Sequence, residues 1–312
     1  MNIAIVGSGI IGLSTAHELL HAGHRVRAFT RDALSEITSS KAAAIWFPYL
    51  ARPVAAVNRW SRESYERYLT QLDRPEAGIS LVDLTVLVKE PDAWWKDAIP
   101  PGTLHTLPPE ELPGDTEYGY TVKAPLIETQ LYLAALEAEV LKLGGKIERS
   151  AVSDLVELAD DYDLVVNCAG LGARELVGDT TMYPVKGQIL KVKNRADVRH
   201  TIADYSFDAA GEQAAYLIPR RDFLIMGGTS IKGDWNTTPD PELTTGILER
   251  CRRITNANLD DVVVDEVVVG LRPGRPEIRV EREGKVIHNY GHGGAGYTVC
   301  WGCAKRVAEL VG

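Results

Sequence analysis

The sequence predicts an α/β fold in which a domain built on a parallel sheet is interleaved with a second, α+β domain that contains a mixed antiparallel sheet. Three observations predict it. A strand, a glycine-rich turn and a helix follow one another within the first thirty residues. Comparable segments return near the middle and the end of the chain. Between residues 187 and 269, β-rich runs alternate with turns, as expected for a separate sheet.

The length and composition fit two globular domains. The chain has 312 residues, of which 45% are hydrophobic and 25% charged, and a domain typically takes roughly 150 residues. We expect the first domain to comprise residues 1–52, 126–183 and 270–312, and the second to comprise 53–125 and 184–269. The 43 acidic residues exceed the 34 Lys and Arg, which leaves a net charge of −9 and disfavours nucleic-acid binding.

The chain lacks targeting and membrane signals. No run of about 18 apolar residues suggests a membrane span, and Met1-Asn2-Ile3 has no basic lead-in of the kind that begins a signal peptide. The last residues, Ala308–Gly312, lack the peroxisomal Ser-Lys-Leu ending. We therefore expect a cytoplasmic protein without membrane partners, and the sequence leaves a homodimer open.

The cysteines indicate neither a disulfide framework nor a metal site. The four, Cys168, Cys251, Cys300 and Cys303, are few and unevenly spaced. Cys300 and Cys303 form a C-x-x-C motif without the second pair that zinc would need. We interpret them as thiols packed in or near a final helix. No metal is predicted, and a disulfide between two of the four stays open.

The N-terminal segment has the signature of a dinucleotide-binding unit. The strand Asn2–Val6 leads into Gly7-Ser8-Gly9-Ile10-Ile11-Gly12, then into a helical pattern that ends at Gly23 and a second strand over 25–29. This context makes the G-x-G-x-x-G match specific. The first glycine permits the tight turn, the second lets the backbone approach a pyrophosphate, and the third lets the helix pack on the strand. The phosphates are expected at the N-terminus of the helix.

The motif does not say which dinucleotide binds. The second strand runs into Arg31 and Asp32 and lacks an acidic residue at its end. Asp32, slightly further on, could bind a ribose, whereas Arg31 could bind the 2′-phosphate of NADP. FAD and NAD(P) both stay open at this point.

Two arginines follow an apolar strand near residue 270. The segment Gly270-Leu-Arg-Pro-Gly-Arg-Pro276 is predicted to hold Arg272 and Arg275 in a turn stiffened by prolines. A guanidinium group matches a carboxylate with two parallel hydrogen bonds, which suits recognition of an acid substrate. A structural arginine paired with a nearby acid is an equally good interpretation of either one.

A second glycine-rich turn precedes the last helix. Four glycines lie between Gly291 and Gly296, which permits close approach of the backbone to a flat ligand. The following helix directs its N-terminus at that ligand and would stabilise negative charge there. His292, within this turn, is interpreted as a packed residue in preference to an acid or base.

Six blocks together resemble the D-amino-acid oxidase family, over nearly the whole chain. They are Gly-Ser-Gly-Ile-Ile-Gly-Leu-Ser-Thr-Ala at 7–16, Ala-Ala-Ala-Ile-Trp-Phe-Pro-Tyr at 42–49, Asn-Cys-Ala-Gly at 167–170, Pro-Val-Lys-Gly-Gln-Ile at 184–189, Gly-Leu-Arg-Pro-Gly-Arg-Pro at 270–276, and the segment 288–304 that ends in Trp-Gly-Cys-Ala. The last two blocks are the most specific.

The resemblance implies a Rossmann-like FAD-binding domain interleaved with a substrate-binding domain. It implies non-covalent FAD and the oxidation of a D-amino acid, by hydride transfer to flavin N5, to an imino acid and then to a 2-oxo acid and ammonia. Oxygen would be reduced to hydrogen peroxide. No residue of the protein is needed as an acid or base at carbon, so catalysis would depend on how the substrate is positioned against the flavin.

The resemblance also implies site residues. Arg272 and Tyr216 would bind the α-carboxylate, the carbonyl of Gly294 would accept from the amine, and Tyr205 is the candidate for a second tyrosine. The cofactor-binding residues predicted from the glycine motif and from the resemblance together are Gly7, Ser8, Gly9, Ile10, Ile11, Gly12, Arg31, Asp32, Ser39, Ser40, Ala43, Ala44, Ile45, Gly170, Gly293, Gly294, Ala295, Gly296, Tyr297 and Thr298.

The substrate side chain is predicted from residues 204–213, where family members carry a mobile lid. This segment has three acids and no Arg or Lys, which favours neutral or basic D-amino acids over D-aspartate. Acids that simply face water are an equally good interpretation. A D-aspartate oxidase, a glycine or amine oxidase, and an NADP-dependent reductase stay as alternatives.

Overall fold

The chain forms two compact units. The computed structural model describes residues 1–48, 50–91, 93–113, 116–206 and 213–312, and the statements below concern these residues. The first unit comprises Met1–Ser80, Pro125–Tyr183 and Arg272–Gly312, and the second comprises Leu81–Ala124 and Pro184–Leu271. The chain passes between them four times, at residues 80/81, 124/125, 183/184 and 271/272.

The first unit is built on a sheet with strand order β14-β15-β7-β1-β2-β6. All of its neighbouring pairs are parallel except β14 with β15. The carboxyl ends of five strands therefore lie at one edge, where ligands bind in open α/β sheets. The strands are β1 (Asn2–Val6), β2 (Arg25–Thr30), β6 (Lys146–Arg149), β7 (Leu164–Asn167), β14 (Arg279–Glu283) and β15 (Val286–Tyr290).

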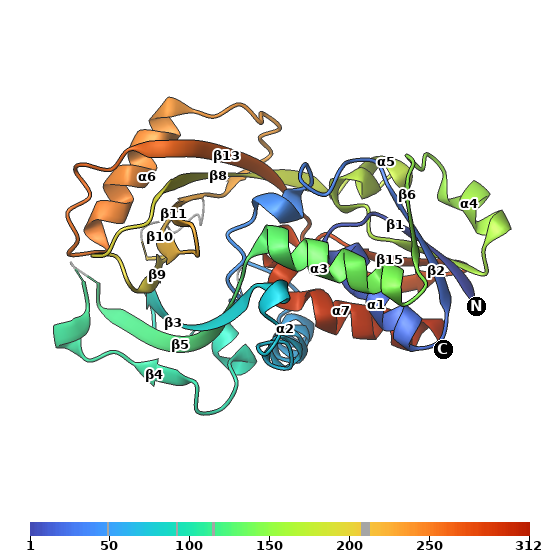
Figure 1. Cartoon of the computed structure of the whole chain (residues 1–312), viewed down its shortest axis with the longest axis horizontal. Helices are drawn as coiled ribbons and strands as arrows, with labels where there is room; N and C mark the ends of the chain where they lie inside the picture. The colour runs from blue at the N-terminus through green and yellow to red at the C-terminus, as the bar shows by residue number, and fades with distance from the viewer. Residues whose placement is uncertain (49, 92, 114–115, 207–212) are drawn as a thin grey trace. The chain divides into compact units, whose positions relative to one another are not determined.

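Helices cover this sheet. In Figure 1, α1, α3 and α7 lie side by side, and α1 packs against both of the others. The helices of the unit are α1 (Ile10–His21), α2 (Val54–Leu69), α3 (Thr129–Lys142), α4 (Leu155–Asp161), α5 (Ala173–Leu176) and α7 (Gly296–Val311), with 3-10 turns η1 (Thr38–Lys41), η2 (Pro75–Ala77), η5 (Gly170–Gly172) and η6 (Gly293–Ala295). Both ends of the chain belong to this unit (Figure 1).

Helix α2 lies in the first unit, although residues 53–80 were expected in the second. It packs closely against α7, where a Cβ at Gly302 would lie 2.3 Å from the Cα of Trp60. The Ser64 hydroxyl of α2 accepts the N–H groups of Trp301 and Gly302, each at 3.1 Å. These are tertiary contacts, which the helical pattern of α2 does not reveal.

The second unit is a mixed sheet covered on one face by α6. Its strand order is β12-β8-β11-β10-β9-β3-β5-β4, and β13 pairs with β8. Residues of β8, β9, β10 and β11 form one apolar core with Ile247 and Cys251 of α6. The elements are β3 (Ile79–Val88), η3 (Trp94–Ala98), β4 (Leu104–Thr106), η4 (Pro109–Glu111), β5 (Tyr118–Ile127), β8 (Tyr183–Lys193), β9 (Thr201–Asp204), β10 (Gln213–Pro219), β11 (Phe223–Thr229), β12 (Ile231–Lys232), α6 (Pro241–Arg253) and β13 (Val264–Gly274). Four of these strands, β3, β5, β8 and β13, include a boundary between the units, so their end residues, among them Arg272, are counted with the first unit.

One local prediction was wrong in a way that matters for the site. The prolines around residue 274 predicted a turn, but β13 continues to Gly274, so Arg272 and Pro273 belong to a strand. Proline is tolerated there because β13 pairs with β8 alone among the described strands, and an edge strand has no second neighbour that needs the missing N–H. Arg272 is therefore presented by a strand and not by a loop.

The interpretation of the C-x-x-C motif as packed thiols is confirmed. Cys300 and Cys303 lie in α7, and all four cysteines are buried and free. Burial raises the pKa of the Cys300 thiol to about 12, which makes it a poor nucleophile. Among the described helices, none combines the length and hydropathy needed to cross a bilayer.

Candidate cofactor site

The turn between β1 and α1 is closed by backbone contacts that leave no room for side chains. Gly7 has φ +107°, and a Cβ there would lie 2.4 Å from the carbonyl oxygen of Cys168. A Cβ at Gly12 would lie 1.9 Å from the carbonyl oxygen of Gly7. The first glycine thus lets β1 meet the end of β7, and the third lets α1 fold back on its own turn.

The N-terminus of α1 is open to an anion. Gly9 is its N-cap and carries no side chain that could cap the helix, and no acidic residue lies in its first turn. The Ser39 hydroxyl accepts the N–H of Ile10 at 3.1 Å, which places this serine beside the turn. The Ser40 hydroxyl lies within donating distance of the carbonyls of Ser35 and Ile37, so it is already engaged with backbone. Backbone N–H groups and the helix dipole both favour a phosphate here.

A cavity of about 240 Å³ lies where β2 and β6 end. Pockets that enclose a whole ligand usually measure roughly 300–1,000 Å³, so this one suits a single moiety of a dinucleotide. Its walls combine polar and apolar groups, among them Ser8, Thr30, Asp32, Leu141, Ile147 and Arg149.

Asp32 lines this cavity, whereas Arg31 is not among its lining residues. The two side chains form an ion pair, with Arg31 Nη2 2.9 Å from Asp32 Oδ2. The hydrogen bond from Arg31, outweighing the effect of burial, lowers the pKa of the Asp32 carboxyl. An ionised carboxylate is an acceptor, which suits the hydroxyls of a ribose.

The other two parallel strands at this edge also end in turns that the resemblance implicated. After β7, Gly170 has φ +58° and begins η5. After β15, Gly291 has φ +83° and Gly293 has φ +54°. Gly293 is half-buried and Gly294 is exposed, so this stretch of backbone is accessible to a ligand.

Residues 43–45 are hydrogen-bonded to the end of β5. The N–H of Ile127 donates to the carbonyl of Ala44 at 3.0 Å, and the N–H of Trp46 donates to that of Pro125 at 2.8 Å. Ala44 is buried, whereas Ala43 and Ile45 are partly exposed. Ala44 also has φ +49°, a left-handed conformation that costs an L-residue about 1–2 kcal/mol. Such strain is often stored at ligand sites.

Helix α7 begins directly after the second glycine-rich turn. Its N-cap residue makes no side-chain cap bond and no acidic residue lies in its first turn, so the positive end of its dipole favours a negative ligand. The Thr298 hydroxyl donates to the carbonyl of Phe47 at 2.9 Å, and the Tyr297 hydroxyl donates to the carbonyl of Ser39 at 2.9 Å. These bonds join α7 to the segments around residues 39 and 47.

His292 is a packed, neutral residue. It is 3% exposed, and burial lowers its pKa to about 3. Its Nε2 is buried without a hydrogen-bond partner among the described residues. An imidazole in this state does not exchange protons near neutral pH, which agrees with the interpretation as a packed residue.

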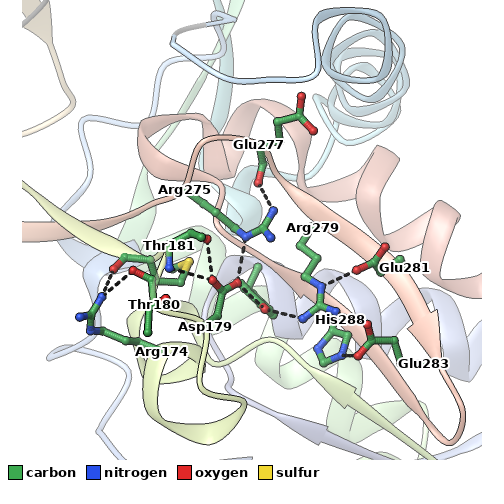
Figure 2. Close-up of polar contacts among 12 residues, drawn as sticks. Arg174, Asp179, Thr180, Thr181, Arg275, Glu277, Arg279, Glu281, Glu283 and His288 are labelled. Atoms are coloured by element: carbon green, nitrogen blue, oxygen red, sulfur yellow. Dashed lines mark hydrogen bonds and ion pairs between the residues drawn. The ribbon is translucent and has the colours of Figure 1, made fainter.

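The second arginine of the 270–276 segment has a structural role (Figure 2). Arg275 Nε donates to Asp179 Oδ2 at 2.9 Å, and its Nη1 donates to the carbonyl of Glu277 at 2.9 Å. The same carboxylate oxygen accepts from the Tyr290 hydroxyl at 2.8 Å. A Cβ at Gly291 would lie 2.8 Å from the Cβ of Arg275. The Asp179–Arg275 pair therefore supports the start of the glycine-rich turn.

The four predicted substrate residues are divided between the units. Arg272, half-buried in β13, and Gly294 belong to the first unit, whereas Tyr205 and Tyr216 belong to the second. Arg272 differs from Arg275 in its setting, because it lies within the strand and not after it.

Tyr216 lies on β10, on the face of the second sheet away from α6. Its neighbours Ala215 and Leu217 belong to the core beneath α6, and successive strand residues point to opposite faces. Its ring covers two glycines of β11, where a Cβ at Gly227 would lie 2.1 Å from Tyr216 Cζ and one at Gly228 would lie 2.3 Å from its hydroxyl. The glycines provide the space that the tyrosine ring occupies.

Tyr205 follows β9, is half-buried, and donates its N–H to the carbonyl of Leu87 at 3.0 Å. Asp204 before it is 2% exposed, and burial raises its pKa. It pairs with Ala215, so it lies on the α6 face, and the interpretation that this acid faces water is wrong. Asp208 and Glu212 lie outside the described residues.

Comparison with known proteins identifies the family. The family model described as FAD dependent oxidoreductase matches residues 2–310. The chain belongs to this family. It is therefore an oxidoreductase with FAD as its cofactor, and the NADP alternative left by Arg31 is excluded.

Curated relatives match over more than nine-tenths of their length. A "D-amino-acid oxidase" of Rubrobacter xylanophilus is 38% identical, covering 99% of this chain and 95% of the relative. Proteins of the same name from Dictyostelium discoideum and Streptomyces coelicolor are each 37% identical, covering 91% and 96% of those relatives.

Solved structures share the fold at lower identity. A glycine oxidase from Geobacillus kaustophilus has a TM-score of 0.80 at 19% identity, covering 99% of this chain and 94% of the other. One from Bacillus cereus has a TM-score of 0.80 at 21% identity, with the same coverage. The predicted α/β fold is confirmed.

The residues present fit FAD. The glycine turn admits a pyrophosphate because Gly9 carries no side chain, and a Cβ there would lie 3.0 Å from Ser39 Oγ. The adjoining cavity and the accessible turn at Gly293 and Gly294 belong to the same edge of the sheet. Sequence reasoning missed Arg149 and Ile147, although the rule that ligands bind beyond the carboxyl ends of parallel strands would have drawn attention to the end of β6.

The strain at Ala44 leads to a prediction. We expect Ala44→Gly to raise the free energy of unfolding by about 1 kcal/mol, because glycine adopts φ +49° without the penalty of a Cβ. Urea denaturation measures the change. Ala43→Gly is the matched control and is expected to lower stability slightly, since Ala43 is outside the left-handed region. Equal effects of the two substitutions would contradict the assignment of strain.

The Asp179 carboxylate gives a prediction on pH. Burial raises its pKa, but hydrogen bonds from Thr181, Tyr290 and Arg275 outweigh burial and hold the pKa well below its ordinary value. A depressed folded-state pKa contributes stability above the unfolded-state value of about 3.9, and that stability is lost as pH falls. We expect Asp179→Asn to lower the free energy of unfolding by about 1–3 kcal/mol at pH 7.

The difference from wild type should then narrow below about pH 4, by about 1.4 kcal/mol per pH unit. Denaturation midpoints between pH 3 and 7 test this. Asp265→Asn, at an exposed position of β13, controls for the general loss of a carboxylate. A constant difference between Asp179→Asn and wild type over this range would show that Asp179 is not the titrating group.

Proposed function

We propose that this FAD dependent oxidoreductase converts D-amino acids to imino acids, which hydrolyse to 2-oxo acids and ammonia, while oxygen is reduced to hydrogen peroxide. The observation that carries the proposal is the similarity, over nearly the whole of both chains, to three relatives named D-amino-acid oxidase. The blocks around Arg272 and Gly293, which are the most specific part of the family resemblance, support the same activity.

Arg272 is the proposed anchor for the α-carboxylate. The pairing of Arg275 with Asp179 favours Arg272 as the arginine of this segment that binds substrate. A strand holds the side chain more rigidly than a loop, and a guanidinium fork fixes both oxygens of a carboxylate. Tyr216 would donate its hydroxyl to the same group, Tyr205 is the candidate for a second tyrosine, and the carbonyl of Gly294 would accept from the α-amine.

The proposed catalysis rests on positioning. FAD, when bound, supplies the hydride acceptor. The chain holds the carboxylate and the amine at fixed points, so only one enantiomer directs its Cα hydrogen toward that acceptor. The N-terminus of α7 favours negative charge on the ligand it faces. A protein acid or base at carbon is not required, and the low pKa of His292, about 3, fits this scheme.

Neutral or basic D-amino acids are the proposed substrate class. The segment 204–213 contains no Arg or Lys to pair with a side-chain carboxylate. Asp204, on the α6 face, does not add to this argument. A preference for D-aspartate would therefore need a cation from another part of the chain.

The role of Arg272 can be tested by steady-state kinetics. We expect Arg272→Ala to raise KM for D-alanine and lower kcat/KM by about 30-fold to 4,000-fold, since loss of a buried charged hydrogen-bonding partner costs about 2–5 kcal/mol. Arg272→Lys should lie between wild type and Arg272→Ala, because it keeps the charge and loses the fork. Flavin absorbance of each purified variant controls for loss of FAD. Wild-type kinetics in Arg272→Ala would refute the anchor.

Hydrogen peroxide production by the wild-type protein, measured on a panel of substrates, separates the D-amino-acid oxidase proposed here from the other two kinds of oxidase. The proposal expects turnover of D-alanine and D-arginine, weak turnover of D-aspartate and none of L-alanine. Higher activity on D-aspartate would indicate a D-aspartate oxidase. Higher activity on glycine or sarcosine than on D-alanine would indicate a glycine or amine oxidase.

A further inference from the structure

Two histidines and a glutamate meet where α1 packs on α3, away from the glycine turn. His17 and His21 lie one helical turn apart on α1, with ring centroids 4.4 Å from each other. Glu139 comes from α3. One potential ligand atom from each of the three lies within 4.8 Å of the others. We propose that His17, His21 and Glu139 form a binding site for a divalent transition-metal cation, with Zn²⁺ as its reference ion.

The spacing of the ligand atoms fits such an ion. Zinc ligands lie about 2.0–2.2 Å from the metal, so two ligand atoms of a tetrahedral site are about 3.4 Å apart. His17 Nε2 lies 3.4 Å from Glu139 Oε1. His21 is exposed and can rotate to complete the set. Two imidazoles and one carboxylate suit zinc and its neighbours in the transition series, whereas Ca²⁺ and Mg²⁺ require oxygen ligands.

Each of the two more enclosed ligands also has a partner on its other polar atom. His17 Nδ1 faces Glu18 Oε1 at 3.6 Å, and Glu139 Oε2 accepts from Arg74 Nη1 at 3.0 Å. Both ring nitrogens of His17 thus face a carboxylate oxygen, Nδ1 that of Glu18 and Nε2 that of Glu139, which fixes the orientation of the ring. This carboxylate–histidine–metal arrangement is the usual outer shell of zinc sites, where it orients the imidazole and raises its basicity.

The carboxylates and guanidinium groups around the cluster balance in charge, so they carry no net positive charge that would repel a cation. Two carboxylates, Glu18 and Glu139, face two guanidinium groups, Arg67 and Arg74, whose side chains are 36% and 37% exposed. Arg67 Nη2 is 3.4 Å from both ring nitrogens of His17. In the ring plane this position would collide with Cε1, so the guanidinium lies over the ring face. It therefore does not occupy the in-plane direction from which Nε2 would bind a metal.

A bound ion would join α1 to α3 and stabilise the folded state. None of the three ligands belongs to the glycine turn or to the predicted substrate residues, so the inference is independent of the proposed reaction. No metal was predicted from the sequence, because only the His17-x-x-x-His21 spacing is visible there and Glu139 joins the two histidines through tertiary packing.

The test uses the FAD-loaded protein after treatment with a chelator and dialysis. Isothermal titration with ZnCl₂ should show one ion bound per chain, and Zn²⁺ should raise the thermal unfolding midpoint whereas Mg²⁺ should not. His21→Gln and Glu139→Gln should each weaken Zn²⁺ binding by at least about tenfold. Removing a residue that only orients a metal ligand already costs about 10- to 100-fold in affinity, and these variants remove a ligand itself. His21 is exposed, so its variant should keep the fold.

His24→Gln is the matched control, and it should keep wild-type affinity for Zn²⁺. His24 lies just beyond α1, where its Nδ1 is 3.3 Å from the N-terminal amine. Loss of binding in His24→Gln alone would place the ion at the N-terminus and overturn the proposal. Absence of Zn²⁺ binding to the wild-type protein, or full binding in both His21→Gln and Glu139→Gln, would overturn it as well.

Discussion

The close backbone approach at the end of β1 is the constraint on which the cofactor site depends. Gly7 and Gly12 bring the turn within contact distance of β7 and of α1, and a side chain at either position would collide with a carbonyl oxygen. The consequence is a helix that begins at the sheet edge with a glycine as its N-cap, no acidic residue in its first turn, and the Ser39 hydroxyl accepting the N–H of Ile10. An anion is the natural partner of such a helix end.

The parallel sheet places further turns beside this one at the same edge. Because five strands run in the same direction, their carboxyl ends bring together turns from residues 7, 31, 150, 168 and 291, which are far apart in the chain. A second helix whose N-cap residue makes no side-chain cap bond, α7, follows the last of these turns. The start of the glycine-rich turn before α7 packs against Arg275, whose side chain is held by its ion pair with Asp179.

Features that depend only on neighbouring residues could be predicted from local patterns in the sequence. The β1–α1–β2 unit and the glycine roles could be inferred, because strand, turn and helix signals are contiguous there. The packed state of His292 followed from the usual behaviour of a histidine in such a turn. Features that depend on tertiary contacts could not. The position of α2 in the first unit depends on Gly302 contacting Trp60, and the roles of the two arginines separate only when Asp179 is seen beside Arg275. The extension of β13 through Pro273 was missed because proline signals a turn, and its edge position in the sheet is not visible in the sequence.

The most direct test of the account is the dissociation constant of FAD for the apoprotein with Gly9→Ala, measured by fluorescence titration. Gly9 has an extended backbone, and its added Cβ would meet only Ser39 Oγ, at 3.0 Å, so the apoprotein should fold. Gly172→Ala, whose Cβ would make an ordinary 3.6 Å contact, is the control. The account predicts that Gly9→Ala weakens FAD binding by at least about tenfold, or 1.4 kcal/mol, while the control keeps wild-type affinity. Unchanged FAD affinity in Gly9→Ala would contradict it.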